Sequence, residues 1–114
     1  MEKIVEQGLL YDFYGELLTA HQRKVYEDVV FNDLSPSEIA GELGISRQGV
    51  HDLMKRCDKI LEEYEAKLHL VAKFVKIRDM AREVEQLAAE CARTRDMALI
   101  EQIHGLAGKI TGTL

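Results

Sequence analysis

The stretch from Leu34 to Arg56, LSPSEIAGELGISRQGVHDLMKR, constrains the fold more than any other part of the sequence. Ser35, with Glu38 three residues later, has the spacing of a capping box at the start of a helix. Gly44 stands where that helix must end, because glycine adopts the left-handed conformation at little cost. Ser46 is a suitable N-cap for a second helix. The stretch therefore predicts two short helices joined by a tight turn.

The apolar positions of these two helices have the spacing of a helix-turn-helix over residues 35–56. The small Ala40 lets the second helix approach the first, and Val50 and Leu53 fill the wedge between them. Ala, then Gly after four residues, Val after six more and Leu after another three is the pattern of such motifs. The alternative is an ordinary helical hairpin within a core.

The flanking segments predict an all-α protein. Residues 2–17 form an amphipathic helix, and Thr19 with Gln22 has the spacing of a capping box for a second helix. The helix that starts at Ser46 is expected to continue past Arg56 to Leu68, because residues 55–68 contain neither Gly nor Pro. The apolar stripe expected for the first helix is Ile4, Val5, Leu9, Leu10, Phe13 and Leu17, with Tyr11 and Tyr14 at its edges. Residues 1–68 are therefore expected to form a three-helix, helix-turn-helix bundle preceded by an N-terminal helix.

Residues 69–114 are expected to form a C-terminal helical extension, joined to the bundle at His69. Apolar residues there alternate by four and three positions, as in an a/d seam: Leu70, Phe74, Ile77, Ala81, Val84, Ala88 and Cys91. Such a seam favours a homodimer through residues 70–91 or, alternatively, packing on the N-terminal helix. Asp96 is the expected N-cap of a short last helix, whose glycine-containing end is expected to fray.

Charge limits the classes of partner. The chain of 114 residues has 15 Lys and Arg against 20 Asp and Glu, a net charge of −5. This balance excludes a protein that coats nucleic acid non-specifically, because such binding depends on neutralising phosphates with cations. It is compatible with a local basic patch.

Cysteine usage and the N-terminus predict a cytoplasmic protein. Cys57 and Cys91 are far apart in helical patterns, which is typical of free thiols in a reducing compartment. The N-terminal MEKIVEQGLL is too charged for a secretory signal, and no apolar run approaches the ~18 residues of a membrane span. We expect no membrane association.

The titratable residues do not form a recognisable catalytic or metal site. The four histidines lack the helical partners and the CxxC or HExxH companions of metal ligands: His21, His51, His69 and His104. We expect them on helix surfaces, and we expect neither a cofactor nor enzymatic activity.

The second helix of the motif has the chemistry of a recognition helix. With Ile45, Val50, Leu53 and Met54 expected inward, the predicted nucleic-acid contacts are Ser46, Arg47, Gln48, His51, Lys55, Arg56 and Lys59. Arg pairs with guanine and Gln with adenine, while Lys contacts phosphates. Residues 46–59 carry four positive and two negative charges, a local sum of +2, although Asp52 lies on the outward face. The alternative is a solvated face in a module that binds protein.

The phrases DFYGELLT, LSPSEIA, ISRQGVHD and YEAKL, in this order between Leu10 and Leu70, resemble the YlxM family of small bacterial proteins. The central part is also similar to region 4 of sigma factors, which contacts promoter DNA. The resemblance implies an all-helical, sigma-region-4-like bundle with added C-terminal helices. It also implies DNA binding and a link to the signal recognition particle, because the gene tends to lie beside that of the particle's GTPase.

Two functional hypotheses follow. The first is a helix-turn-helix regulatory protein that binds DNA or RNA through residues 46–59 and is tied to the signal recognition particle. The second is an accessory protein that docks on the GTPase or RNA of that particle without sequence-specific DNA binding. The local patch favours the first and the acidic balance favours the second. A structural dimer is a third, weaker alternative.

Overall fold

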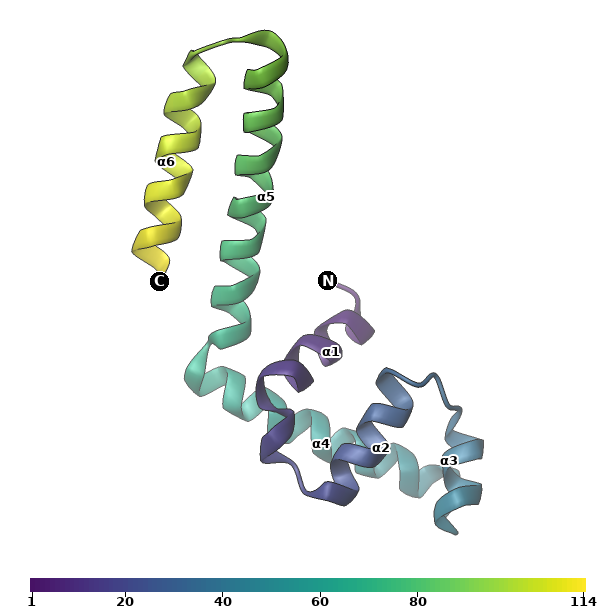
Figure 1. Cartoon of the computed structure of the whole chain (residues 1–114). Coiled ribbons are helices and arrows are strands. Elements are labelled where there is room, and N and C mark those ends of the chain that lie inside the picture. The colour runs from purple at the N-terminus through teal and green to yellow at the C-terminus, as the bar shows by residue number, and fades with distance from the viewer. The chain divides into compact units, whose positions relative to one another are not determined.

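The computed structural model describes residues 1–114 and contains six α-helices, one 3-10 turn and no strand (Figure 1). The all-α class predicted from the sequence is confirmed. The chain divides into two compact units, Met1–His69 and Leu70–Leu114, and each is described by itself. None of the helices is long and apolar enough to cross a membrane.

The first unit contains four helices and the 3-10 turn: α1 (Lys3–Tyr14), η1 (Gly15–Leu17), α2 (Ala20–Val30), α3 (Pro36–Leu43) and α4 (Arg47–Leu68). Side-chain oxygens cap the three helices after α1, as the sequence predicted. Thr19 Oγ1 accepts from the Gln22 amide at 3.2 Å, and Ser35 Oγ accepts from the Glu38 amide at 3.1 Å. Both capping boxes are complete. Because each cap satisfies an amide that lacks a helical partner, these residues fix where the helices begin.

The turn of the motif also follows the sequence. Gly44 ends α3 with φ 68°, in the left-handed region where glycine is favoured. Helix α4 runs through Arg56 to Leu68 and ends at His69, the joint expected from the sequence, with φ 56°. Helix α3 packs on α4, and both contact α2, which completes the helix-turn-helix.

The core of this unit lies where α1, α2 and α3 meet α4. Its largest fully buried side chains are Tyr14, Tyr26, Ile39, Leu61, Val25, Val50 and Cys57. The two tyrosines keep their hydroxyls hydrogen-bonded within this core. Tyr26 donates to Asp58 at 2.7 Å and Tyr14 donates to Glu65 at 2.6 Å. The rings therefore contribute apolar area without leaving a buried hydroxyl unsatisfied.

The expected stripe of α1 needs correction. Tyr14, predicted at the edge, is buried, while Ile4 and Leu17 are 50% and 54% exposed. Only one narrow face of α1, centred on Leu10 and Tyr14, is buried in the core. The helix has more apolar residues than this face accommodates, and the 3-10 turn redirects the chain before Leu17. Phe31, the C-cap of α2, is likewise half exposed although it is apolar.

The second unit is a hairpin of α5 (Leu70–Thr94) and α6 (Ala98–Thr113), which lie side by side and run in opposite directions (Figure 1). Arg95, with φ 59°, turns the chain between them. Asp96 was expected as the N-cap of α6, but Met97 takes that position; Asp96 stands one residue earlier, where its Oδ1 accepts from the Ala98 amide at 3.0 Å. The buried or half-buried apolar positions along the paired part of the hairpin are Ile77, Met80, Val84, Leu87 and Cys91 on α5, and Leu99, Ile103, Leu106 and Ile110 on α6.

Three expectations for this unit change. Ala81 and Ala88 are exposed, and the larger Met80 and Leu87 take their places in the seam, because they bury more apolar area against α6. The seam packs along α6, which was neither of the two alternatives expected from the sequence. Helix α6 is also longer than expected, since it continues through Gly105, Gly108 and Gly112 to Thr113.

Candidate nucleic-acid interface

The first half of α4 presents the predicted binding residues to solvent. All seven are exposed: Ser46, Arg47, Gln48, His51, Lys55, Arg56 and Lys59. Since an α-helix has 3.6 residues per turn, positions 47, 48, 51, 55 and 59 share one stripe, about 18 Å long. Arg56 lies about 100° around the helix from Lys55, at the edge of the stripe. The structure therefore brings six of the seven residues to one side of the helix and its N-terminus.

Ser46 is both an N-cap and an anion-binding candidate. Its Oγ accepts from the Gly49 amide at 2.9 Å, which leaves its own hydroxyl hydrogen available as a donor. The first amides of α4 and the helix dipole favour a negative charge at the same place. A phosphate oxygen near Ser46 would therefore meet donors from the backbone and the side chain.

Gln48 and Asp52 form a pair on the stripe. Gln48 Nε2 donates to Asp52 Oδ1 at 2.9 Å, and both side chains are exposed. This bond turns the Gln48 amide along the helix and leaves its carbonyl oxygen as an acceptor. The carboxylate of Asp52 places a negative charge among the cations, which disfavours a phosphate at this point of the stripe.

Ile45 was expected to face inward, but it is 41% exposed. Its Cδ1 lies 3.6 Å from the place that a Cβ on Gly49 would occupy, so the side chain covers the first turn of α4. Ile45 is exposed because it stands just before the N-cap, where an apolar residue packs on the start of the helix rather than in the core. Leu53 is half-buried, and Val50 and Met54 are buried as expected.

A hydrogen-bonded carboxylate ties α4 to its neighbours beside the stripe, where the exposed side of the helix meets its buried face. Asp58 accepts from Tyr26 Oη at 2.7 Å and from Gln7 Nε2 at 3.1 Å to each oxygen. It is half-buried, so it contributes less to the surface charge than the sequence count assumed. Burial, and then the bond to Asp58, raise the pKa of Tyr26 well above its ordinary value. The network ties α1, α2 and α4 together and holds the exposed stripe in place.

A cavity of about 310 Å³ lies beside this network. Its lining residues come from all four helices of the unit: Lys3, Gln7, Val29, Pro36, Val50, His51, Met54, Lys55 and Asp58. Lys3 and Gln7 were not predicted as site residues. Nothing local in the sequence signals them, because only the packing of α1 on α4 brings them next to Lys55 and Asp58.

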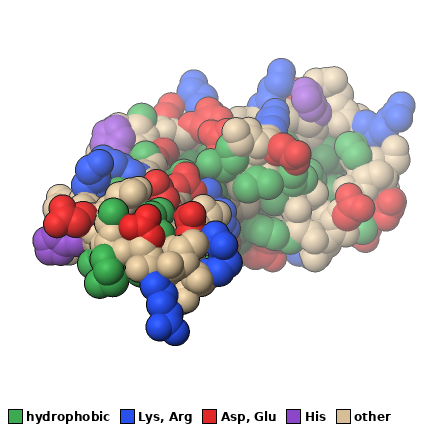
Figure 2. All heavy atoms as spheres, turned by 90° about the horizontal axis from the view of Figure 1, so that it is seen from above, with side chains coloured by type: hydrophobic (Ala, Val, Ile, Leu, Met, Phe, Trp, Pro, Cys, Tyr) green, Lys and Arg blue, Asp and Glu red, His purple; other side chains and the backbone are tan.

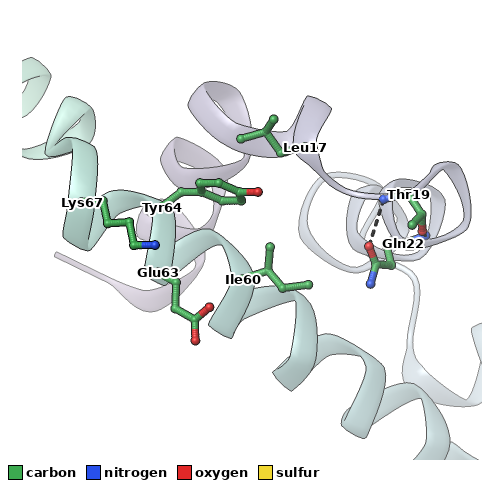
Figure 3. A pocket seen from close by; sticks show the side chains of 7 residues that line it. All are labelled: Leu17, Thr19, Gln22, Ile60, Glu63, Tyr64 and Lys67. Atoms are coloured by element: carbon green, nitrogen blue, oxygen red, sulfur yellow. Dashed lines mark hydrogen bonds between the residues drawn. The ribbon is translucent and has the colours of Figure 1, made fainter.

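A second hollow, of about 500 Å³, lies along the other half of α4 (Figure 3). Its lining residues are Leu17, Thr19, Gln22, Ile60, Glu63, Tyr64 and Lys67. The dashed line in Figure 3 is the capping bond from the Thr19 amide to Gln22 Oε1, at 2.9 Å. Its lining contains none of the seven predicted contact residues.

The unit that carries the stripe is acidic overall. The first unit carries eight Lys and Arg against fourteen Asp and Glu, a formal charge of −6, and the second carries seven against six, +1. Figure 2 shows acidic and basic side chains interspersed on the face that it presents. The cations of α4 are therefore a local feature on an acidic unit, and their field is weakened by these neighbours.

No group of His, Cys, Asp and Glu side chains has the arrangement of a metal site. The four histidines are exposed, as expected. Both cysteines are free thiols. Burial, and then the charge of Asp58, raise the pKa of Cys57 to about 11, so this thiol lacks the low pKa of a reactive cysteine.

A family model described as "UPF0122: Putative helix-turn-helix protein, YlxM / p13 like" matches residues 1–101. The chain belongs to this family. The match covers the whole first unit and extends into α6, so it reaches beyond the run from Leu10 to Leu70 on which the resemblance rested. The family assignment predicted from the sequence is confirmed.

Relatives of known name match over most of the chain. The UPF0122 protein of Bacillus pumilus is 39% identical over 107 residues, which cover 93% of this chain and 97% of the relative. The UPF0122 protein YlxM of Bacillus subtilis is 37% identical over 107 residues, which also cover 93% of this chain and 97% of the relative. UPF0122 protein TTE1463 of Caldanaerobacter subterraneus is 49% identical over 83 residues, 73% of this chain and 68% of the relative.

Proposed function

We propose that this helix-turn-helix protein binds nucleic acid through the exposed stripe of α4 and acts as a regulatory protein. The observation that carries the proposal is the stripe itself. It starts at a capped helix N-terminus, and α1, α2 and α3 support the opposite side of the helix. A recognition helix needs this combination of a rigid buried face and an exposed polar face.

The side chains divide into two roles. Arg47 and Gln48, in the first turn, have the donor and acceptor groups to contact base edges. Lys55, Arg56 and Lys59, about two to three turns further on, suit phosphates, and so does the amide cluster at Ser46. His51 lies between the two sets on the stripe. Asp52 limits phosphate contact in the middle of the stripe, which favours two separated contact regions.

The charge of the first unit sets the expected binding behaviour. Few cations on a unit of −6 support only a small number of phosphate contacts. Since each contact contributes about 0.9 to the salt slope on duplex DNA, we expect a shallow slope and weak binding to unrelated sequences. Specific contacts in the first turn of α4 then have to supply the affinity.

Titrations of promoter DNA and of signal recognition particle RNA at two salt concentrations test the proposal. Lys55→Ala should weaken binding to every sequence and lower the salt slope by about one. Arg47→Ala should cost roughly 1 to 3 kcal/mol and relax the preference at one position only. Lys109→Ala, an exposed cation of α6, is the matched control. Wild-type affinity in both α4 variants would show that another surface makes the contact.

A second candidate function is favoured by the acidity of the first unit. In this alternative, the protein docks on the RNA or the GTPase of the signal recognition particle as an accessory protein, without sequence-specific DNA binding. An acidic surface suits a basic protein partner better than a polyanion. Capture from a bacterial lysate, with and without nuclease, separates the two, because a GTPase contact survives loss of the RNA.

We also propose that the protein is cytoplasmic. We further propose that it forms a homodimer through its second unit. Helix α6 has no fully buried residue, and Ile100 and Met97 are 45% and 67% exposed, so the hairpin retains apolar area for a second copy. Sedimentation equilibrium at micromolar concentration tests the dimer. If the protein is strictly monomeric, the dimer proposal fails and the apolar seam of α5 packs only within its own chain.

A further inference from the structure

We propose that the cavity beside Asp58 binds one unpaired nucleotide of a nucleic-acid strand, with the base inside it and the phosphate between Lys3 and Lys55. The inference rests on the proposed function, because the cavity shares Lys55 and His51 with the stripe of α4. It adds a second and chemically different contact, supplied in part by α1.

The walls of the cavity suit a base that has left the stack. Val29, Pro36, Val50 and Met54 provide its apolar lining. The volume of about 310 Å³ lies at the lower end of the range of ligand cavities, roughly 300 to 1,000 Å³. A base within a duplex presents only its edges to the grooves, whereas an unpaired base of a loop or bulge can enter a cavity and pack its faces on side chains.

The rim supplies two cations from different helices. Lys3 belongs to α1 and Lys55 to α4, and both side chains are exposed. Neither forms an ion pair within the chain. His51 lies on the same rim, one turn before Lys55. Two ammonium groups beside one hollow attract a phosphate. A bound phosphate would give each of them the ion pair that no carboxylate of the protein provides.

The polar part of the lining favours a base with an amino group. Asp58 Oδ1 accepts from both Tyr26 and Gln7, but Oδ2 accepts only from Gln7 and keeps acceptor capacity. The amide oxygen of Gln7 is a further acceptor beside it. Adenine, cytosine and guanine have an exocyclic amino group that donates two hydrogen bonds, and carboxylates accept from such groups. Uracil and thymine lack this group, so they fit less well.

The first test is nuclear magnetic resonance of methyl groups in the full-length protein. Adenosine and cytidine monophosphate, each added at millimolar concentration, should shift the signals of Met54 and Val29. Uridine monophosphate should shift them less. Shifts confined to the exposed side of α4, or equal shifts with all three nucleotides, would overturn the proposal.

The second test uses single-stranded and duplex oligonucleotides with two variants. Val29→Phe fills the cavity and should weaken binding of an adenine- or cytosine-rich single strand by at least about fivefold, with little effect on the duplex. Lys3→Ala, a surface change that leaves the core intact, should weaken single-strand binding and lower its salt slope by about one. Lys109→Ala is the control, and circular dichroism verifies that each variant is folded.

The outcomes separate this inference from the proposed function. If Lys55→Ala weakens binding while Lys3→Ala and Val29→Phe both bind like wild type, the stripe of α4 binds nucleic acid and the cavity does not. If the wild-type protein binds neither single strands nor duplex at low salt, both proposals fail. Loss of single-strand binding in Val29→Phe and in Lys3→Ala, with duplex binding retained, supports the cavity.

Discussion

The two units of the chain differ in how they cover their apolar side chains. In the first unit, four helices enclose seven side chains that are less than 2% exposed. In the second, α5 has two buried residues, Val71 and Met80, and α6 has none. The difference follows from the number of helices. A helix that packs on one neighbour covers one stripe, whereas α4 packs on α1, α2 and α3.

This difference predicts unequal local stability. Few buried apolar contacts mean a low free energy of local opening, so the hairpin should open more readily than the bundle. The sequence provides a convenient probe, because all four tyrosines lie in the first unit: Tyr11, Tyr14, Tyr26 and Tyr64. Tyrosine fluorescence therefore reports on the bundle, while far-UV circular dichroism reports on both units.

The largest expected effect is that of Leu61→Ala, at a position of 0% exposure in the bundle. Deleting this side chain should lower the free energy of unfolding of the first unit by about 2 to 5 kcal/mol, because it removes apolar burial and leaves a cavity. Leu106→Ala on α6, where the side chain is only half-buried, should cost about 1 to 2 kcal/mol. Urea titrations followed by both signals measure the two changes, and equal costs would contradict the unequal packing.

The same contrast explains what the sequence predicted correctly. The bundle was predictable because its signals are local and mutually independent. Thr19 and Ser35 begin helices with complete capping boxes, and Gly44 ends one in the left-handed conformation. The register of the hairpin was not predictable, because the alternation of apolar residues from Leu70 to Cys91 fits two faces of one helix almost equally well. Only the packing of α6 on α5 selects Met80 over Ala81.

Substitution of Ala40 and of Ala81 by leucine tests this difference between the bundle and the hairpin. Ala40 is 8% exposed where α3 crosses α4, so Ala40→Leu should destabilise the bundle by roughly 1 to 3 kcal/mol through overpacking. Ala81 is exposed, so Ala81→Leu should change the unfolding midpoint little. An unchanged midpoint for Ala40→Leu would refute the close helix crossing. A large change for Ala81→Leu would restore the seam expected from the sequence.

The candidate interface was also only partly predictable. The residues of α4 could be placed on one stripe because helical periodicity relates neighbours along the chain. The network of Asp58 with Tyr26 and Gln7 could not be predicted, because these two partners lie 32 and 51 residues away from Asp58 in the sequence. No spacing rule connects residues that only the packing of four helices brings together, and Lys3 was overlooked for the same reason.

Glycine-to-alanine changes should have opposite signs in the two units. Gly44 has φ 68°, where a Cβ is strained, so Gly44→Ala should destabilise the bundle by about 1 to 2 kcal/mol. Gly108 lies within α6 with open space around it, so Gly108→Ala should stabilise the hairpin by about 0.4 to 1 kcal/mol. Thermal unfolding followed by circular dichroism measures both, and the comparison fails if both changes have the same sign.

The smallest effect concerns alkaline pH and should be confined to the bundle. Tyr11 stacks on Tyr26 with ring centroids 5.6 Å apart and donates to Glu27. Burial, and then the bond to Glu27, raise the pKa of Tyr11 from 10.0 to about 12. Between these values the unfolded chain loses the proton and the folded bundle keeps it. Since ionisation then favours the unfolded state, this contribution to stability is full below pH 10 and is lost as the pH rises through about 12.

Tyr11→Phe tests this pH dependence. The variant should be less stable than wild type below pH 10, because it lacks the bond to Glu27, and its stability should fall less steeply above that pH. Tyr26 and Cys57, whose pKa values are also raised by burial, retain part of the slope in the variant. Urea midpoints at about pH 9 and about pH 11, followed by tyrosine fluorescence, measure the change. A slope identical to that of wild type would mean that Tyr11 ionises in the folded bundle as it does in the unfolded chain.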